Sequence, residues 1–98
     1  MKNNICVTIV IPVFNDIISL KKTILKLMEV ISSIPASFEI IIAEDASTDG
    51  SAEYAAECAQ KYNQIIHLHR DERLGRGSAL SRAALMARGE IFCYFDVD

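Results

Sequence analysis

The sequence lacks three features that would point to particular functions: an excess of positive charge, a long apolar run and a closely spaced cysteine pair. Its formal net charge is −3, so no basic surface is expected to attract nucleic acid. No stretch approaches the roughly 20 apolar residues of a membrane-spanning helix, and the apolar run before Pro12 is too short for a secretory signal. We therefore expect a soluble chain that has no membrane span and binds no nucleic acid. Its expected location is cytoplasmic or, within a longer parent protein, at the cytoplasmic face of a membrane.

The three cysteines, Cys6, Cys58 and Cys93, lie far apart and include no C-x-x-C pair. This spacing favours free buried thiols in a reducing compartment over a disulfide framework. Hydrophobic residues make up 51% of the 98 positions and charged residues 23%, which is ordinary for a chain that buries a core. Because repeats, low-complexity tracts and linkers are lacking, we expect one domain over residues 1–98.

Short apolar runs rich in β-branched residues alternate with longer amphipathic segments. The apolar runs are nearly continuous, which is typical of strands buried on both faces of a parallel sheet. In the longer segments the apolar residues return every three or four positions, as on one face of a helix. The order β-α-β-α-β-α-β predicts the α/β class, with a Rossmann-like, three-layer parallel sheet. We expect strands over residues 6–11, 38–43, 64–69 and 91–95, and helices over residues 16–33, 51–62 and 78–88.

Local sequence also suggests where the helices begin and end. Asn15 or Asp16 can cap the first helix, and Gly89 can form the C-cap of the third. Small residues on the third helix permit its close approach to the sheet. The hydroxyl and acidic residues after the second strand can cap the second helix.

Polar side chains gather after each of the four expected strands, whereas the opposite connections carry few ionisable groups. Ligands of open α/β sheets bind outside the carboxyl ends of the strands. The sequence therefore predicts one binding site at this edge of the sheet. The polar clusters occupy residues 12–16, 44–50, 70–77 and 96–98.

The last cluster, Asp96-Val97-Asp98, places two carboxylates at positions i and i+2. Such residues point the same way along an extended chain, so both would face one ligand. Two adjacent carboxylates repel each other unless a cation or proton lies between them, and oxygen ligands with open positions suit Mg²⁺ or Mn²⁺. The alternative is a pair of solvated aspartates in a turn.

The second cluster, EDASTDGS, opens with two acids at the end of an apolar strand. Glu44 and Asp45 can accept hydrogen bonds from a base N–H group or a ribose hydroxyl, and we favour ligand binding for Asp45. For Ser47, Thr48 and Asp49 we favour helix capping through ordinary Asx and Ser/Thr bonds.

The third cluster, RDERLGRG, combines arginines with glycines that permit close backbone approach to a ligand. Arg73 or Arg76 can pair with phosphate, and the alternative is a solvated charged loop. The dinucleotide fingerprint is excluded because Leu80 stands where it needs glycine and because the motif does not follow the first strand. His67 and His69 share one side of a strand. Without a third ligand nearby in sequence, we interpret them as structural residues.

These four clusters, in this order, resemble the nucleotide-sugar half of family 2 glycosyltransferases, which have the GT-A fold. VTIVIPVFND resembles the family's first strand and following turn, and IIIAEDASTDGS resembles its acidic segment. RLGRGSAL and ARGEIFCYFDVD resemble its glycine-containing loop and its D-x-D strand. The resemblance covers essentially the whole chain. Within the family it is most similar to dolichyl- or polyprenyl-phosphate sugar synthases, such as mannosyltransferases.

The resemblance implies a hexosyltransferase that binds a UDP- or GDP-sugar with Mg²⁺ or Mn²⁺ and uses an acceptor such as polyprenyl or dolichyl phosphate. It implies that Asp45 holds the base, that Arg73 lies near the diphosphate, and that Asp96 and Asp98 bind the metal. It identifies no catalytic residue in this chain. The residues implied to contact the nucleotide sugar are Pro12, Val13, Asp16, Glu44, Asp45, Arg73 and Asp96.

In the family, a second half with the acceptor site follows the D-x-D motif. We therefore expect this chain to be the incomplete, donor-binding part of a GT-A domain, with little or no transferase activity alone. The alternative is a non-catalytic nucleotide-binding or interaction module, derived from a degenerate or split gene. A sugar-nucleotide pyrophosphorylase would normally have a glycine-rich loop after the first strand, where this chain has Pro12-Val13-Phe14-Asn15.

Overall fold

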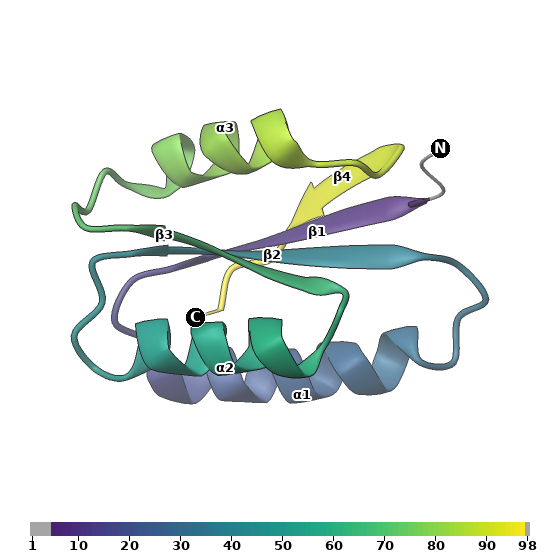
Figure 1. Cartoon of the computed structure of the whole chain (residues 1–98), viewed down its shortest axis with the longest axis horizontal. Helices are drawn as coiled ribbons and strands as arrows, with labels where there is room; N and C mark the ends of the chain where they lie inside the picture. The colour runs from purple at the N-terminus through teal and green to yellow at the C-terminus, as the bar shows by residue number, and fades with distance from the viewer. Residues whose placement is uncertain (1–4, 98) are drawn as a thin grey trace.

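The computed structural model of the chain describes residues 5–97, in which strands and helices alternate strictly (Figure 1). This order confirms the α/β class predicted from the alternation of apolar runs and amphipathic segments. The elements are β1 (Val7–Val13), α1 (Ile17–Ile31), β2 (Phe38–Asp45), α2 (Ser51–Lys61), β3 (Ile65–Arg70), α3 (Arg76–Met86) and β4 (Ile91–Tyr94).

The four strands form one parallel sheet in the order β3-β2-β1-β4. Helices α1 and α2 cover one face of this sheet, and α3 covers the other (Figure 1). The three layers match the Rossmann-like arrangement predicted from the sequence. Because every strand runs the same way, the four carboxyl ends lie at one edge of the sheet.

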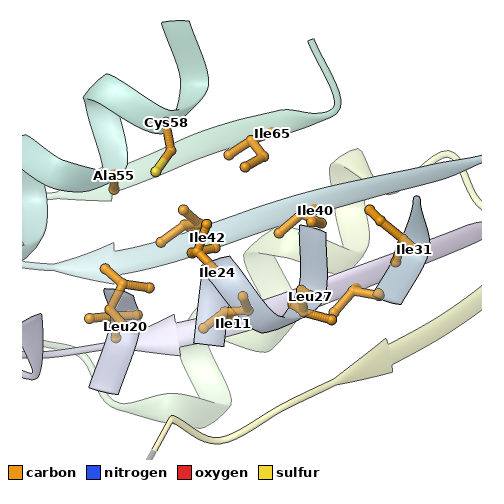
Figure 2. Close-up of a cluster of buried hydrophobic side chains, with 12 residues drawn as sticks. Ile11, Leu20, Ile24, Leu27, Ile31, Ile40, Ile42, Ala55, Cys58 and Ile65 are labelled. Atoms are coloured by element: carbon orange, nitrogen blue, oxygen red, sulfur yellow. The ribbon is translucent and has the colours of Figure 1, made fainter. Parts of the chain in front are cut away.

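The larger part of the core lies between the sheet and the helices α1 and α2 (Figure 2). The four apolar positions of α1 that recur along one face are all buried, as their spacing predicts. They pack against isoleucines of β1 and β2 and against the small side chains of α2. The labelled members of this cluster are Ile11, Leu20, Ile24, Leu27, Ile31, Ile40, Ile42, Ala55, Cys58 and Ile65.

The smaller part of the core lies under α3. Ala79 and Ala83 are its buried residues on the helix, and they pack against Val10, Ile41 and Ala43 of the sheet. Side chains this small let α3 approach the sheet closely, as expected.

At the amino edge of the sheet, a buried carboxylate joins the segment that follows α3 to the strands. Thr8 Oγ1 donates to Glu39 Oε2 at 2.6 Å, and the backbone N–H of Arg88 donates to the same oxygen at 2.6 Å. The Arg88 side chain adds an ion pair to Glu39 Oε1 at 3.0 Å. Burial opposes the ionisation of Glu39, but these hydrogen bonds outweigh it and hold the pKa of the carboxyl below its usual range.

Several expected boundaries differ from the structure. Strands β1 and β2 run on to Val13 and Asp45, because these residues continue the parallel pairing with their neighbours. Helix α3 ends at Met86, so Gly89 is not its C-cap. The run 91–95 is also not buried on both faces: Ile91 and Tyr94 are exposed because β4 is an edge strand.

The cysteines are free thiols, as predicted, but only Cys58 is buried, whereas Cys6 is exposed and Cys93 is half-buried. Among residues 5–97, no helix has both the length and the apolar character needed to span a membrane.

Candidate functional site

A cleft opens at the carboxyl edge of the sheet, on the side covered by α3. It is formed by the ends of β1 and β2, the first turn of α3, the loop before α3 and the residues that follow β4. All four polar clusters that follow the strands contribute to it. Its lining residues are Pro12, Val13, Phe14, Asp16, Ala43, Asp45, Arg73, Gly75, Arg76, Ala79, Asp96 and Val97.

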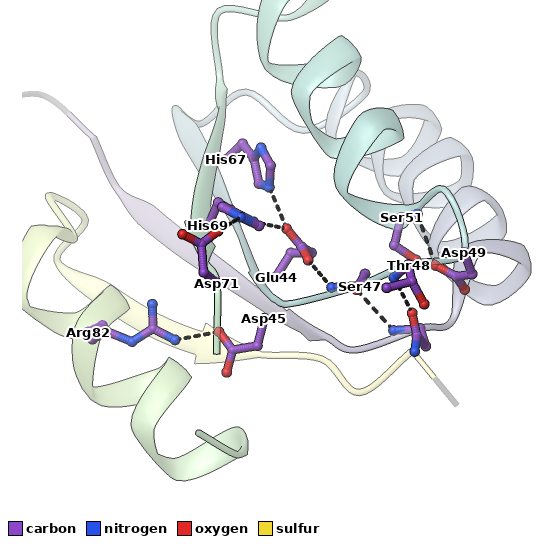
Figure 3. A network of polar contacts seen from close by, with 11 residues as sticks. Glu44, Asp45, Ser47, Thr48, Asp49, Ser51, His67, His69, Asp71 and Arg82 are labelled. Carbon is purple, nitrogen blue, oxygen red and sulfur yellow. Dashed lines mark hydrogen bonds and ion pairs between the residues drawn. The ribbon is translucent and has the colours of Figure 1, made fainter. Parts of the chain in front are cut away.

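Asp45 ends β2 and is held in a fixed position on the α3 side. Its Oδ1 accepts a hydrogen bond from Arg82 Nη2 at 2.6 Å (Figure 3), and its Oδ2 accepts one from the backbone N–H of Leu74 at 3.2 Å. Both side chains of the Arg82–Asp45 pair are largely buried, so solvent screens this charge pair weakly. Arg82 is a partner that sequence reasoning missed.

Two arginines bring positive charge to the mouth of the cleft. The guanidinium of Arg73 lies over the ring of Phe14, with 4.1 Å between its central carbon and the ring centroid, which is a cation–π contact. Arg76 is the first residue of α3, and Gly75 before it has φ +90°, a conformation that favours glycine. Because α3 begins here, its unpaired N–H groups add to the positive potential.

Asp96 is the described member of the D-x-D pair, and Asp98 lies outside the described residues. Asp96 follows β4 and lines the cleft, and its Oδ1 is 3.4 Å from Arg76 Nε. These side chains are 40% and 56% exposed, so the ion pair contributes little to stability and is easily exchanged. Asp45 and Asp96 therefore line one cleft, as the resemblance requires.

The loops after β1 and β2 are joined by hydrogen bonds that fix one wall of the cleft. The backbone N–H of Asn15 donates to Ser47 Oγ at 3.0 Å, and the N–H of Thr48 donates to Asn15 Oδ1 at 2.6 Å. Asn15 and Ala46 both have φ +49°, so the turns depart from ordinary extended backbone. This cross-loop bonding was not predicted for Ser47 and Thr48, which we expected to cap the second helix.

Asp49 accepts hydrogen bonds from the first turns of two helices. Its Oδ2 accepts the N–H of Ile17 in α1, and its Oδ1 accepts the N–H and the hydroxyl of Ser51 in α2. Asp49 is exposed, and the desolvation that it does undergo opposes ionisation, but the bonds from Ser51 and Ile17 outweigh this and hold the pKa of Asp49 below its ordinary value. The cap of α1 thus comes from another loop, and Asn15 and Asp16 do not supply it.

Glu44 faces away from the cleft, toward the side of α1 and α2, because neighbouring residues of a strand point to opposite faces. Its Oε1 is 2.9 Å from His67 Nε2 and 2.6 Å from His69 Nδ1, and its Oε2 accepts the N–H of Ser47 at 2.7 Å (Figure 3). Burial opposes ionisation of Glu44, but these bonds outweigh it and lower the pKa of the carboxyl.

His69 lies between two carboxylates. Its Nε2 is 2.9 Å from Asp71 Oδ1, while its Nδ1 faces Glu44. The bonds to Glu44 and Asp71 raise the pKa of His69 above its ordinary value. The residue that joins the two histidines, Glu44, lies on another strand. The sequence close to the histidines therefore gave no indication of it.

Comparison with known proteins places this geometry in a family. A family model described as glycosyl transferase family 2 matches residues 8–98. The chain belongs to glycosyltransferase family 2. The match covers all four strands except for Val7, and it covers the whole cleft, so it agrees with the resemblance carried by the four polar clusters.

Two similar proteins are named as glycosyltransferases. Glycosyltransferase AglD of Haloferax volcanii is 42% identical over 94 residues, which cover 94% of this chain and 15% of AglD. Dolichyl-phosphate beta-glucosyltransferase ALG5D of Trichomonas vaginalis is 26% identical over 102 residues, which cover 99% of this chain and 31% of that protein. This family 2 chain thus spans less than a third of the length of either relative.

A solved mannosyltransferase structure has a similar fold. The mannosyltransferase PcManGT of Pyrobaculum calidifontis, in complex with GDP-Man and Mn²⁺, superposes with a TM-score of 0.79 and 25% sequence identity. The superposition covers 98% of this chain and 28% of that structure. The GT-A fold predicted from the resemblance is therefore confirmed for this chain.

Proposed function

We propose that this family 2 chain forms the donor-binding part of a glycosyltransferase and binds a nucleotide-diphosphate sugar in the α3-side cleft. The main supporting observation is that four charged residues from separate parts of the chain line one cleft: Asp45 at the end of β2, Arg73 in the loop before α3, Arg76 at the start of α3 and Asp96 after β4. A structure with 25% identity whose complex contains GDP-Man supports a nucleotide sugar as the ligand.

Each side of the cleft suits a different part of that ligand. The Asp45 carboxylate, oriented by Arg82, is an acceptor for the N–H of a uracil or guanine base. Arg73 and Arg76, next to the first turn of α3, suit the negative charge of a diphosphate. We assign Pro12, Val13 and Asp16 to the wall beside the nucleotide.

The carboxylates in the cleft fit a divalent metal. Asp96 is half-exposed, and its one ion pair within residues 5–97 is the long contact to Arg76, so its oxygens are available to a cation. Hard oxygen donors suit Mg²⁺ or Mn²⁺, and we retain Asp98 as the second ligand. A bound cation of this kind stabilises the negative charge that develops on a leaving nucleoside diphosphate.

The chain's own residues contribute orientation and charge. Arg82 and the N–H of Leu74 fix Asp45, and the Phe14 ring fixes Arg73, so the polar groups are positioned before the ligand arrives. Positive side chains near the diphosphate would lower the energy of the charge that builds up there during transfer.

We further propose a polyprenyl phosphate as the acceptor of the whole protein. ALG5D is named a dolichyl-phosphate glucosyltransferase, and a transferase of Edwardsiella ictaluri that is 28% identical over 93 residues is named for undecaprenyl phosphate. The acceptor contacts are not among the groups assigned to this cleft, so we expect donor binding but little turnover from this chain alone.

Calorimetric titration of the chain with GDP, UDP and GDP-mannose, each with and without Mn²⁺, tests the proposal. We expect binding that Mn²⁺ strengthens. Asp45→Asn should weaken it at least about ten-fold, equivalent to roughly 1.4 kcal/mol. Asp96→Asn should remove the dependence on Mn²⁺. Glu53→Gln, an exposed acid on α2, is the matched control and should bind as the wild type does.

Circular dichroism of each variant separates a lost contact from a lost fold. If the folded wild type binds none of these nucleotides with Mn²⁺ present, the proposal fails and the non-catalytic module is favoured. Binding that is the same in Asp45→Asn and Glu53→Gln would also refute the assignment of this cleft.

A further inference from the structure

A second cluster of potential ligands lies on the other face of the sheet, behind the cleft. Glu44 of β2 faces His69 directly, because the two residues are partners in the parallel register, and His67 lies two residues earlier on the same side of β3. One oxygen, Glu44 Oε1, lies 2.9 Å from His67 Nε2 and 2.6 Å from His69 Nδ1 (Figure 3). Three potential ligand atoms from two adjacent strands thus lie close together.

We propose that Glu44, His67 and His69 form a binding site for a transition-metal dication of the Zn²⁺ type. Two imidazole nitrogens with one carboxylate oxygen form a donor set that suits Zn²⁺, whereas Mg²⁺ prefers oxygen ligands alone. This site would be separate from the Mg²⁺ or Mn²⁺ position proposed in the cleft, and it does not depend on the proposed donor binding.

The distances are close to those that a bound ion requires. The three ligand atoms all lie within 4.8 Å of one another. A tetrahedral Zn²⁺ with bonds of about 2.0–2.1 Å needs its ligand atoms roughly 3.3 Å apart. Glu44 Oε1 therefore needs to move about 0.4 Å further from His67 Nε2 and about 0.7 Å further from His69 Nδ1, and the two nitrogens, which lie within 4.8 Å of each other, need to be roughly 3.3 Å apart. Side-chain rotations of the two histidines supply these changes.

The surrounding contacts are also those of a metal site. Asp71 Oδ1 lies 2.9 Å from the outer nitrogen of His69 and would accept its N–H when Nδ1 binds an ion, and a metal-bound histidine usually has a carboxylate or carbonyl at that position. The N–H of Ser47 holds the other oxygen of Glu44 and so orients the carboxylate. These two contacts would fix the ligands before an ion arrives.

The site is partly exposed to solvent, so an ion can reach it and a fourth ligand can come from solvent. The Glu44 side chain is fully buried, the His67 side chain is 14% exposed and the His69 side chain is 41% exposed. β3 is an edge strand, so solvent reaches the site from the His69 side. We infer that water or a solvent-borne ligand completes the coordination, and that the ion ties the edge strand β3 to β2.

The test uses this chain with Cys6→Ser, because the exposed Cys6 thiol is a competing zinc ligand. Zn²⁺ is titrated by calorimetry in excess Mg²⁺, and thermal unfolding is followed with and without Zn²⁺. We expect one equivalent of bound Zn²⁺ and a raised Tm, because an ion that binds only the folded state stabilises it. Co²⁺ should give the visible absorption of a tetrahedral site with nitrogen and oxygen ligands.

Matched variants locate the ion. His67→Gln and His69→Gln should each weaken Zn²⁺ binding at least about ten-fold, and Asp71→Asn should weaken it about 10–100-fold through His69. Asp71 is 96% exposed, so its variant is expected to fold even if the histidine variants do not. Asp96→Asn, in the cleft, should leave Zn²⁺ affinity unchanged.

Two results would overturn the proposal. One is a folded Cys6→Ser chain that takes up no Zn²⁺. The other is Zn²⁺ affinity that Asp71→Asn and any folded histidine variant leave as it was, which would make the cluster a hydrogen-bond network only.

Discussion

Substitution of Gly89 by alanine should destabilise the fold sharply. Gly89 lies between α3 and β4, and its N–H donates to Thr8 Oγ1 at 2.9 Å. A Cβ atom at this position would lie 2.5 Å from the backbone nitrogen of Thr8 and 2.7 Å from both Thr8 Oγ1 and the carbonyl carbon of Val7. These neighbours belong to β1, which pairs with strands on both sides and cannot move independently.

Two costs add in the Gly89→Ala variant. Overpacking of a well-packed interior typically costs about 1–3 kcal/mol. Displacement of the Gly89 N–H from Thr8 loses a hydrogen bond of about 1 kcal/mol. We therefore expect a loss of about 2–4 kcal/mol in the free energy of unfolding. At about 4–8 °C per kcal/mol for a domain of this size, Tm should fall by roughly 10–30 °C.

Gly77→Ala is the matched control for this measurement. Gly77 lies within α3, and a Cβ added there has no heavy atom within 4 Å. Alanine should stabilise this helical position by up to about 1 kcal/mol, since it has the higher helix propensity. Urea unfolding followed by circular dichroism measures both variants. A Gly89→Ala chain within about 0.5 kcal/mol of wild type, the usual range of neutral surface changes, would refute the close approach of Gly89 to β1.

Three further predictions concern buried or capping charges. The pKa of Glu39 is lowered from 4.5, so its contribution to stability is complete above pH 4.5 and is lost as pH falls through the lower folded-state pKa. In wild type the urea midpoint should therefore decrease as pH falls below 4.5, and this decrease should be smaller in Glu39→Gln. An equal decrease in both proteins would contradict this prediction. Arg82→Gln should cost about 3–5 kcal/mol in urea unfolding, because Asp45 would keep a buried charge without its partner. Asp49→Ala should cost about 1–2 kcal/mol by uncapping α1 and α2, and equal stability of the variant would exclude that role.

Much of the fold could be predicted because the spacing of apolar residues along the sequence indicates which side chains are buried. The period of α1 places Leu20, Ile24, Leu27 and Ile31 on one face, and the structure buries all four. Strand ends were less predictable, since Val13 and Asp45 stand beside residues typical of turns yet continue the pairing of β1 and β2. Pairing depends on the neighbouring strand, which local sequence does not contain.

The sequence was sufficient to predict which loops lie together at the site. It was not sufficient to predict which side chains contact one another. Parallel strands bring Asp45 and Asp96 to one edge whatever the details of packing. Arg82, by contrast, reaches Asp45 from within α3, where only the final docking of the helix brings the two together. Cross-strand partners such as Glu44 and His69 likewise depend on register, which the order of elements alone does not determine.

The different surroundings of Glu44 and Asp45 follow from the pleat of β2. Two successive acids point to opposite faces, so Asp45 lies among arginines under α3 while Glu44 lies among imidazoles behind the sheet. A single acidic pair thus contributes to two environments of different ligand chemistry, one bordered by guanidinium groups and one by imidazole nitrogens. Because metal preference depends on donor type, the imidazoles behind the sheet favour the Zn²⁺ that we propose at Glu44, whereas Asp45 is positioned to accept a base N–H group in the site that we propose in the cleft.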